Sequence, residues 1–168
     1  YLQSMSFEDI FVCGTFGVSS SRTLRAGVQT LGLGSWTSQG LLHYPGMVSY
    51  RHTFFLPALR GRVVLEKGMF AGSCMTYCVN GREYDVPWSE VEAVDVTDAV
   101  VDGRNKLEIH VYGSPRNMLG PLHLKHMGPV TNPQSFFPAV QDRTDSYQVV
   151  EVGLLSNPNI CLYQGELA

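Results

Sequence analysis

The sequence has little charge and no long run of apolar residues. Only 16% of its 168 residues are charged, and the formal net charge is −3. An acidic balance argues against attraction to the phosphate backbone of nucleic acids. We therefore expect no nucleic-acid partner. Since no apolar run is long enough to span a bilayer, we also expect no membrane partner.

Cysteine is also scarce. The four cysteines are Cys13, Cys74, Cys78 and Cys161, too few in a chain of this length for a disulfide-dense framework. Cys74 and Cys78 share one face of an expected strand but lie too far apart to bond, and no further ligands complete a zinc site. We expect these cysteines to be buried free thiols.

The sequence motifs of common enzyme classes are missing. There is no Gly-x-Ser-x-Gly turn and no P-loop, and Gly32-Leu33-Gly34 lacks the third glycine of a dinucleotide-binding loop. His123 and His126 have a spacing that could hold a metal, but no acidic or sulfur ligand stands nearby. We expect His123 to hydrogen-bond loop backbone and expect no catalytic residue. A stand-alone hydrolase using His123 with an acidic partner is the weaker alternative.

Glycine and proline, by contrast, are frequent. Seventeen glycines and nine prolines punctuate short runs of alternating apolar and polar residues, which is typical of an all-β chain. The clearest predicted strands are Met47–Leu56, which Pro57 ends, and Lys106–Tyr112, with Leu107, Ile109 and Val111 facing inward. Further strands are predicted at Phe7–Val18, Thr23–Leu33, Arg62–Leu65, Ala71–Val79, Tyr147–Val152 and Ile160–Tyr163.

The segments between the predicted strands carry recognisable turn chemistry. Asn80-Gly81 suits a two-residue type I′ hairpin, because both residues tolerate a positive φ. Thr97 to Gly103 predicts one short helical turn with Thr97 as its N-cap. Gly34–Gly46 predicts a long loop, and a long irregular stretch with five prolines follows Tyr112.

Acidic residues cluster around the predicted helical turn. Asp95, Asp98 and Asp102 could supply oxygen ligands to a structural calcium ion. The simpler interpretation is that Asp98 caps the turn and Asp102 belongs to turn chemistry. We therefore expect no cofactor, with calcium at these three residues as the alternative.

Aromatic residues in loops suggest a binding function. Sugars stack on Trp and Tyr rings while polar side chains bind their hydroxyls. Trp36, Tyr44 and Trp88, together with Arg82, are the candidate carbohydrate contacts. Each aromatic residue could instead pack against the end of a sandwich, and for Trp36 the glycine-rich flanks favour that packing.

Several stretches in order resemble the galactose-binding-like jelly-roll domains, also called sugar-binding domains, of bacterial glycoside hydrolases in the β-galactosidase and rhamnosidase-like groups. The stretches are Gly14–Val18, Trp36–Gly40 with Tyr44-Pro45-Gly46, Tyr50–Phe54, Val79-Asn80-Gly81, Val94–Thr97 with Gly103–Leu107, and Arg116-Asn117 through Gly120–His123. The likeness covers most of the chain from about Phe7 to Gly153. The motif residues Asn80, Gly81, Gly103, Asn105, Arg116, Asn117 and His123 are mostly structural in such domains.

This resemblance implies a jelly-roll β-sandwich that accompanies a catalytic barrel elsewhere in a larger protein. We expect Tyr1–Met5 to be the remnant of an engineered cleavage site and residues 6–168 to be one domain excised from a multidomain protein. The expected partners are an oligosaccharide and other domains of the same polypeptide. A purely structural module is the alternative. An extracellular or periplasmic location follows from the resemblance alone.

Overall fold

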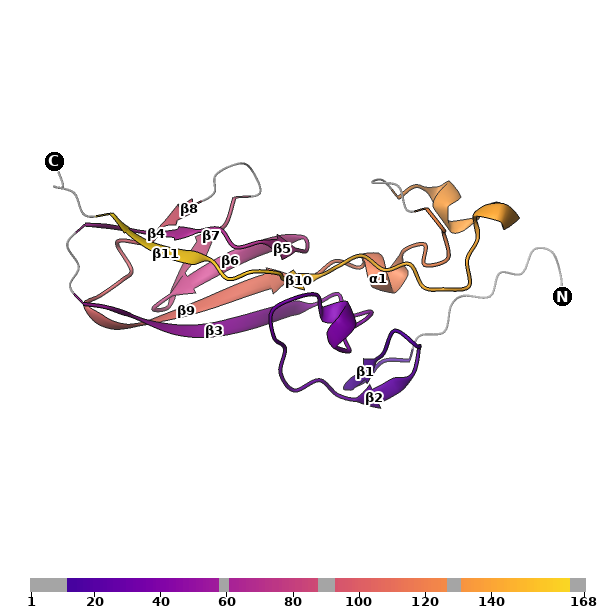
Figure 1. Cartoon of the computed structure of the whole chain (residues 1–168), viewed down its shortest axis with the longest axis horizontal. Coiled ribbons are helices and arrows are strands. Elements are labelled where there is room, and N and C mark those ends of the chain that lie inside the picture. Colours follow the sequence, from indigo (N-terminus) through magenta and orange to yellow (C-terminus); the bar gives the residue numbers. More distant parts are fainter. Residues whose placement is uncertain (1–11, 58–60, 88–92, 127–130, 164–168) are drawn as a thin grey trace.

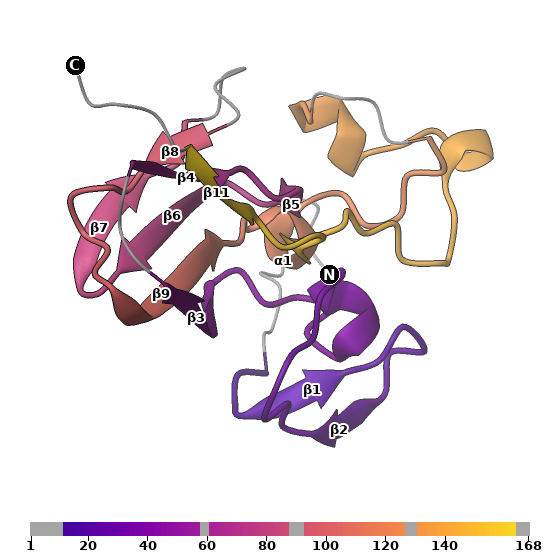
Figure 2. The same ribbon diagram turned by 60° about the vertical axis from the view of Figure 1, so that its left-hand side comes forward.

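The computed structural model describes residues 12–57, 61–87, 93–126 and 131–163. These residues form short antiparallel sheets with only brief helical segments, so the chain belongs to the all-β class. Figures 1 and 2 show two layers of strands, from which the chain extends at one end. In the described ranges, no helix has the length and apolar character needed to cross a membrane.

One layer is a four-stranded antiparallel sheet. Its strand order is β3 (Met47–Leu56), β9 (Gly103–Tyr112), β6 (Cys74–Val79) and β7 (Arg82–Asp85). The prediction for β3 is confirmed to the residue, and β9 extends the predicted strand back to Gly103. The alternation in β9 is confirmed as well, since Leu107, Ile109 and Val111 are all buried.

The other layer is made of shorter pieces. Strands β11 (Asn159–Tyr163), β4 (Arg62–Glu66) and β8 (Ala93–Asp95) form one sheet, in that order. Beside it, β10 (Gly153–Leu154) pairs with β5 (Phe70–Ala71). A separate hairpin joins β1 (Phe16–Val18) to β2 (Leu24–Ala26).

Four strand predictions differ from the structure. Within the described residues, the predicted strand Phe7–Val18 is a strand only at β1, and its residues 7–11 lie outside the described ranges. The predicted strand Ala71–Val79 is divided between β5 and β6, because Gly72 and Ser73 bend the chain between them. The stretch Thr23–Leu33 pairs only at β2, which ends immediately before Gly27. The stretch Tyr147–Val152 pairs with no strand of the described residues, and regular pairing begins at Gly153.

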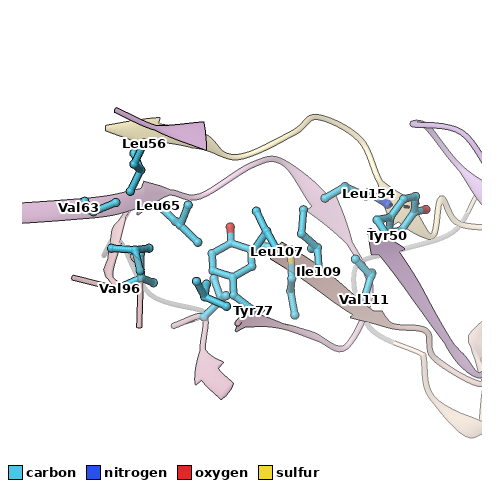
Figure 3. Close-up of a cluster of buried hydrophobic side chains, with 14 of the residues drawn as sticks. Tyr50, Leu56, Val63, Leu65, Tyr77, Val96, Leu107, Ile109, Val111 and Leu154 are labelled. Carbon is cyan, nitrogen blue, oxygen red and sulfur yellow. Dashed lines mark hydrogen bonds between the residues drawn. The ribbon is translucent and has the colours of Figure 1, made fainter. Parts of the chain in front are cut away.

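A hydrophobic core fills the space between the two layers. Figure 3 shows Val63 and Leu65 of β4 facing Tyr77 of β6 and Leu107 of β9. All four side chains are almost completely shielded from solvent. Burying an aliphatic or aromatic side chain of this size contributes about 1.5–3 kcal/mol, so this contact is what holds the sandwich-like arrangement together.

The two predicted turns have different outcomes. At the hairpin between β6 and β7, Asn80 has a φ of 50° and Gly81 a φ of 91°, which confirms a type I′ turn. The backbone after Thr97 does make one helical turn, in which Val100 N–H donates to the Val96 carbonyl. Thr97 is not its cap, however, because its hydroxyl accepts from Val63 N–H on β4 at 2.9 Å.

The cysteine prediction is half right. All four cysteines are free thiols, but Cys13 and Cys74 are exposed and Cys78 and Cys161 are only partly buried. Burial and the neighbouring Glu83 raise the pKa of Cys78, and a hydrogen bond to Glu66 raises that of Cys161. The expectation of buried thiols is wrong because the side chains of Cys74 and Cys78 alternate with the buried residues of β6.

The irregular stretch after β9 leaves the sandwich. It begins with α1 (Arg116–Leu119) and continues into a segment that we call the arm, residues 121–126 and 131–149. The arm contains two 3₁₀ turns, η2 (Pro133–Phe136) and η3 (Val140–Asp142). Figures 1 and 2 show it in orange, projecting away from both sheets.

Candidate functional site

Trp36 is a core residue. It opens the 3₁₀ helix η1 (Trp36–Gln39) and has 0% exposed area. Its indole N–H donates to the Tyr50 hydroxyl at 2.6 Å, so the polar edge of the ring is satisfied inside the protein. A fully buried ring presents no face to a sugar. The candidate role of Trp36 as a carbohydrate contact is therefore corrected to packing.

Tyr44 lies at the surface next to Trp36. Its side chain is 40% exposed, and its ring centroid is 6.0 Å from that of Trp36. The hydroxyl donates to the Met47 carbonyl at 3.1 Å, which fixes the ring beside the start of β3. Met47 pairs with Tyr112, so Tyr44 sits at the β9 C-terminal end of the four-stranded sheet.

Arg82 lies at the opposite end of that sheet. It pairs with Val79, which in turn pairs with Leu107. The guanidinium forms an ion pair of 2.7 Å with Asp98 and lies 5.7 Å from the centroid of the Tyr84 ring. Arg82 and Tyr44 are thus not brought together, and Trp88 lies outside the described residues.

Two of the three carboxylates proposed for calcium, those of Asp95 and Asp98, accept hydrogen bonds from side chains. Asp95 accepts from Arg62 Nε at 2.6 Å and from the Thr97 hydroxyl, also at 2.6 Å. The Thr97 hydrogen bonds, helped by Arg62, lower the pKa of Asp95. Asp98 accepts from Arg82 and from the Tyr84 hydroxyl.

The Asp98 carboxylate belongs to a network with Arg82 and Tyr84. Across residues 12–57, 61–87, 93–126 and 131–163, no three His, Cys, Asp or Glu side chains form a group that could hold a metal ion. Burial and the Asp98 hydrogen bond raise the pKa of Tyr84 to about 12. Asp98 is therefore part of an Arg–carboxylate–tyrosine network rather than an open ligand.

The motif residues Asn80 and Asn105 form a network under the β6–β7 hairpin. The buried Asn105 side chain bonds both the N–H and the carbonyl of Val101, each at 2.8 Å. Asn80 donates to the Asn105 side-chain oxygen at 2.7 Å and accepts from Lys106 N–H at 2.9 Å. Gly103, with a φ of 89°, turns the chain into β9 between these bonds. The network fixes the hairpin to the loop before β9.

A second set of motif residues anchors the arm. Asn117 is 2% exposed, and its side chain both donates to the Val150 carbonyl and accepts from Val150 N–H, each at 2.8 Å. Arg116 donates to the Pro121 carbonyl at 3.3 Å, and burial lowers its pKa. These contacts bind backbone, as a structural role requires.

His123 also bonds backbone, as predicted. Its Nδ1 lies 2.9 Å from the Thr144 carbonyl, and Thr144 N–H donates to the His123 carbonyl at 2.9 Å. The imidazole packs edge-on against Tyr147, with centroids 5.3 Å apart. These contacts join the two halves of the arm.

The outer face of the four-stranded sheet carries a row that sequence reasoning missed. Ser49 Oγ lies 2.8 Å from His110 Nδ1, and His110 Nε2 lies 3.9 Å from Glu83. The order resembles a nucleophile, a base and an acid. Backbone N–H groups in a sheet point along its plane toward neighbouring strands, so the sheet backbone at Ser49 does not form the usual oxyanion hole of acyl transfer.

A depression at the edge of the other layer was also missed. Its rim comes from the end of β4 and the start of β11, including Glu66 and Asn159. These residues are paired in the sheet but are 93 positions apart in the chain. No local spacing in the sequence could have joined them.

Comparisons with known proteins give a likeness to solved structures but not to a family model or a curated protein. Among solved structures, the chain is similar to a rhamnosidase from Novosphingobium sp. PP1Y, with a TM-score of 0.51 and 22% sequence identity. The likeness covers 72% of this chain but only 11% of the rhamnosidase chain. The chain therefore has the fold of a small part of that enzyme.

Proposed function

We propose that the chain is a non-catalytic accessory domain of a glycoside-hydrolase-like protein, with the galactose-binding-like jelly-roll architecture. The observation that carries the proposal is the likeness to a segment making up 11% of a rhamnosidase chain. Two layers of antiparallel strands around one core are compatible with a jelly roll.

The first role we propose for the domain is packing against other parts of the same polypeptide. The arm exposes apolar side chains that a free surface seldom carries together: Phe137 is 85% exposed, Val140 is 90% exposed, and Phe136 is also exposed. In the similar rhamnosidase, most of the chain lies outside the matched part. A neighbouring domain in the parent polypeptide is therefore the occupant that we assign to this surface.

Hydrogen–deuterium exchange would test the packing role. The exchange of residues 131–142 is compared between the isolated chain and the longer polypeptide that contains it. We expect strong protection of these residues in the longer polypeptide only, with β9 amides, protected in both, as the internal control. Equal exchange of residues 131–142 in the two samples would contradict the packing role.

The second role we propose is carbohydrate binding. Tyr44 keeps an exposed ring beside the sandwich, which supports the expected use of loop aromatics. The separation of Tyr44 from Arg82 means that these two residues would serve different contacts rather than one sugar. Trp88 remains a candidate from the sequence.

An activity assay would test the non-catalytic assignment. The purified chain is incubated with a panel of nitrophenyl glycosides and with nitrophenyl acetate. We expect no turnover above buffer for any substrate. Turnover that co-purifies with the chain and disappears in H110A would show that the Ser49–His110–Glu83 row is catalytic, and the accessory assignment would then be wrong.

A further inference from the structure

The depression at the edge of the β4–β11 layer has the size of a ligand site. Its volume is about 560 Å³, and ligand pockets commonly measure about 300–1,000 Å³. The side chains that line it are Glu66, Lys67, Met69, Phe70, Leu155 and Asn159. A carboxylate, an ammonium and an amide are thus combined with three apolar side chains.

The walls of the depression are fixed by backbone hydrogen bonds. Met69 N–H donates to the Ser156 hydroxyl at 2.8 Å, and the Met69 carbonyl accepts from the N–H groups of Leu155 and Ser156 at 2.8 and 3.0 Å. Gly68 lies so close that a Cβ there would come within 2.3 Å of the Ser156 carbonyl oxygen. The two loops therefore form one rigid rim, which lowers the entropic cost of binding.

The polar groups of the rim are held in place but retain bonding capacity. Asn159 Nδ2 donates to Glu66 Oε2 at 3.3 Å. Each carboxylate oxygen accepts more than one hydrogen bond, and the Asn159 amide oxygen is a further acceptor. Lys67 Nζ donates to the Pro87 carbonyl at 3.4 Å, which keeps its ammonium at the rim.

We propose that this depression binds a neutral carbohydrate. Sugar hydroxyls donate to a carboxylate and accept from amide and ammonium groups, while the C–H face of a pyranose packs on apolar side chains such as the 65% exposed Met69. This inference rests on the second role proposed above, carbohydrate binding.

Nuclear magnetic resonance titration of the chain would test the proposal. Methyl glycosides of galactose, glucose and mannose, and the corresponding disaccharides, are added to the ¹⁵N-labelled chain. We expect saturable shifts for at least one sugar in the amides of residues 66–70 and 155–159. In E66Q, we expect the affinity for that sugar to fall about tenfold or more, since a hydrogen bond to a charged group is lost.

The control variant is E108Q. Glu108 is also a strand carboxylate, but it pairs with Arg51 on the four-stranded sheet, and its replacement is expected to leave sugar affinity unchanged. If E66Q lowers the melting temperature, N159A at an exposed position provides the same test.

Two outcomes would overturn the assignment in different ways. Saturable shifts confined to residues around Tyr44 would retain carbohydrate binding but reject this depression as its site. No shifts with any of these sugars would reject both the depression and the carbohydrate role, while the packing role, which depends on the arm, would stand.

Discussion

The sandwich and the arm are held in their conformations by different forces. In the sandwich, strands from both layers bury a continuous set of aliphatic and aromatic side chains. In the arm, Pro121 is the only buried residue among those described, and polar groups such as Asn117 and His123 make the attachments. Apolar burial stabilises many residues together, whereas a few hydrogen bonds stabilise a segment locally. We therefore expect the sandwich to unfold as a unit and the arm to open before it.

The largest expected effect comes from a fully buried side chain of the sandwich. Trp36 is fully buried against the sandwich core, and its N–H bonds the Tyr50 hydroxyl. Replacing a buried aromatic residue with alanine costs about 3–5 kcal/mol, and W36A also removes the shorter of the two hydrogen bonds that the Tyr50 hydroxyl accepts. We expect a drop of this size in the free energy of unfolding by urea. The neighbouring Y44A, at an exposed ring, is the control and should cost much less; equal losses would contradict the core assignment of Trp36.

A second prediction concerns alkaline pH and the sandwich core. Burial raises the pKa of Tyr77 to about 12, and the backbone amide of Gly68 offsets this only in part. An unfolded tyrosine deprotonates near pH 10, so the stabilisation is complete below pH 10 and is lost as the pH rises toward 12. A difference of about two pKa units corresponds to roughly 2–3 kcal/mol. We expect Y77F to flatten the loss of stability between pH 10 and 12.

At neutral pH the same variant tests how the Tyr77 hydroxyl is satisfied. The hydroxyl makes no hydrogen bond of full geometry with the described residues. Removing an unsatisfied buried polar group while keeping the ring is nearly neutral or stabilising. Urea unfolding of Y77F at pH 7 should therefore match the parent chain within about 0.5 kcal/mol. A large loss at pH 7 would mean that the hydroxyl has a strong partner.

The third prediction addresses the anchor of the arm. The Asn117 side chain makes both hydrogen bonds that an antiparallel strand would make to Val150. In N117A the Val150 groups lose these partners, each at a cost of about 1–3 kcal/mol if they stay buried. We expect the arm to detach instead, so that limited proteolysis within residues 131–149 accelerates while the sandwich keeps most of its stability. N132A, which removes an exposed cap of η2, is the control and should change cleavage far less.

The strands and the hairpin turn of the sandwich can be predicted from the sequence better than the depression and the surroundings of Trp36. The strands β3 and β9 could be predicted because alternation and Pro57 are local signals, and the Asn80-Gly81 turn because its φ angles follow from residue type. The depression could not be predicted, since Glu66 and Asn159 meet only through the pairing of β4 with β11. The glycine-rich flanks of Trp36 favoured its packing, but its hydrogen-bond partner Tyr50 could not be predicted, because the two meet only in the folded chain.

The smallest expected effect on the free energy of unfolding comes from a substitution at the tip of the arm. Phe137 is 85% exposed, so F137S removes little buried apolar area and should change the free energy of unfolding of the isolated chain by less than about 0.5 kcal/mol. L65A in the core of the sandwich is the matched contrast and should cost about 2–5 kcal/mol. Both values come from urea unfolding followed by circular dichroism. If F137S destabilised the isolated chain as much as L65A, the arm would be packed into the domain, and its exposed side chains would no longer be available to a neighbouring domain.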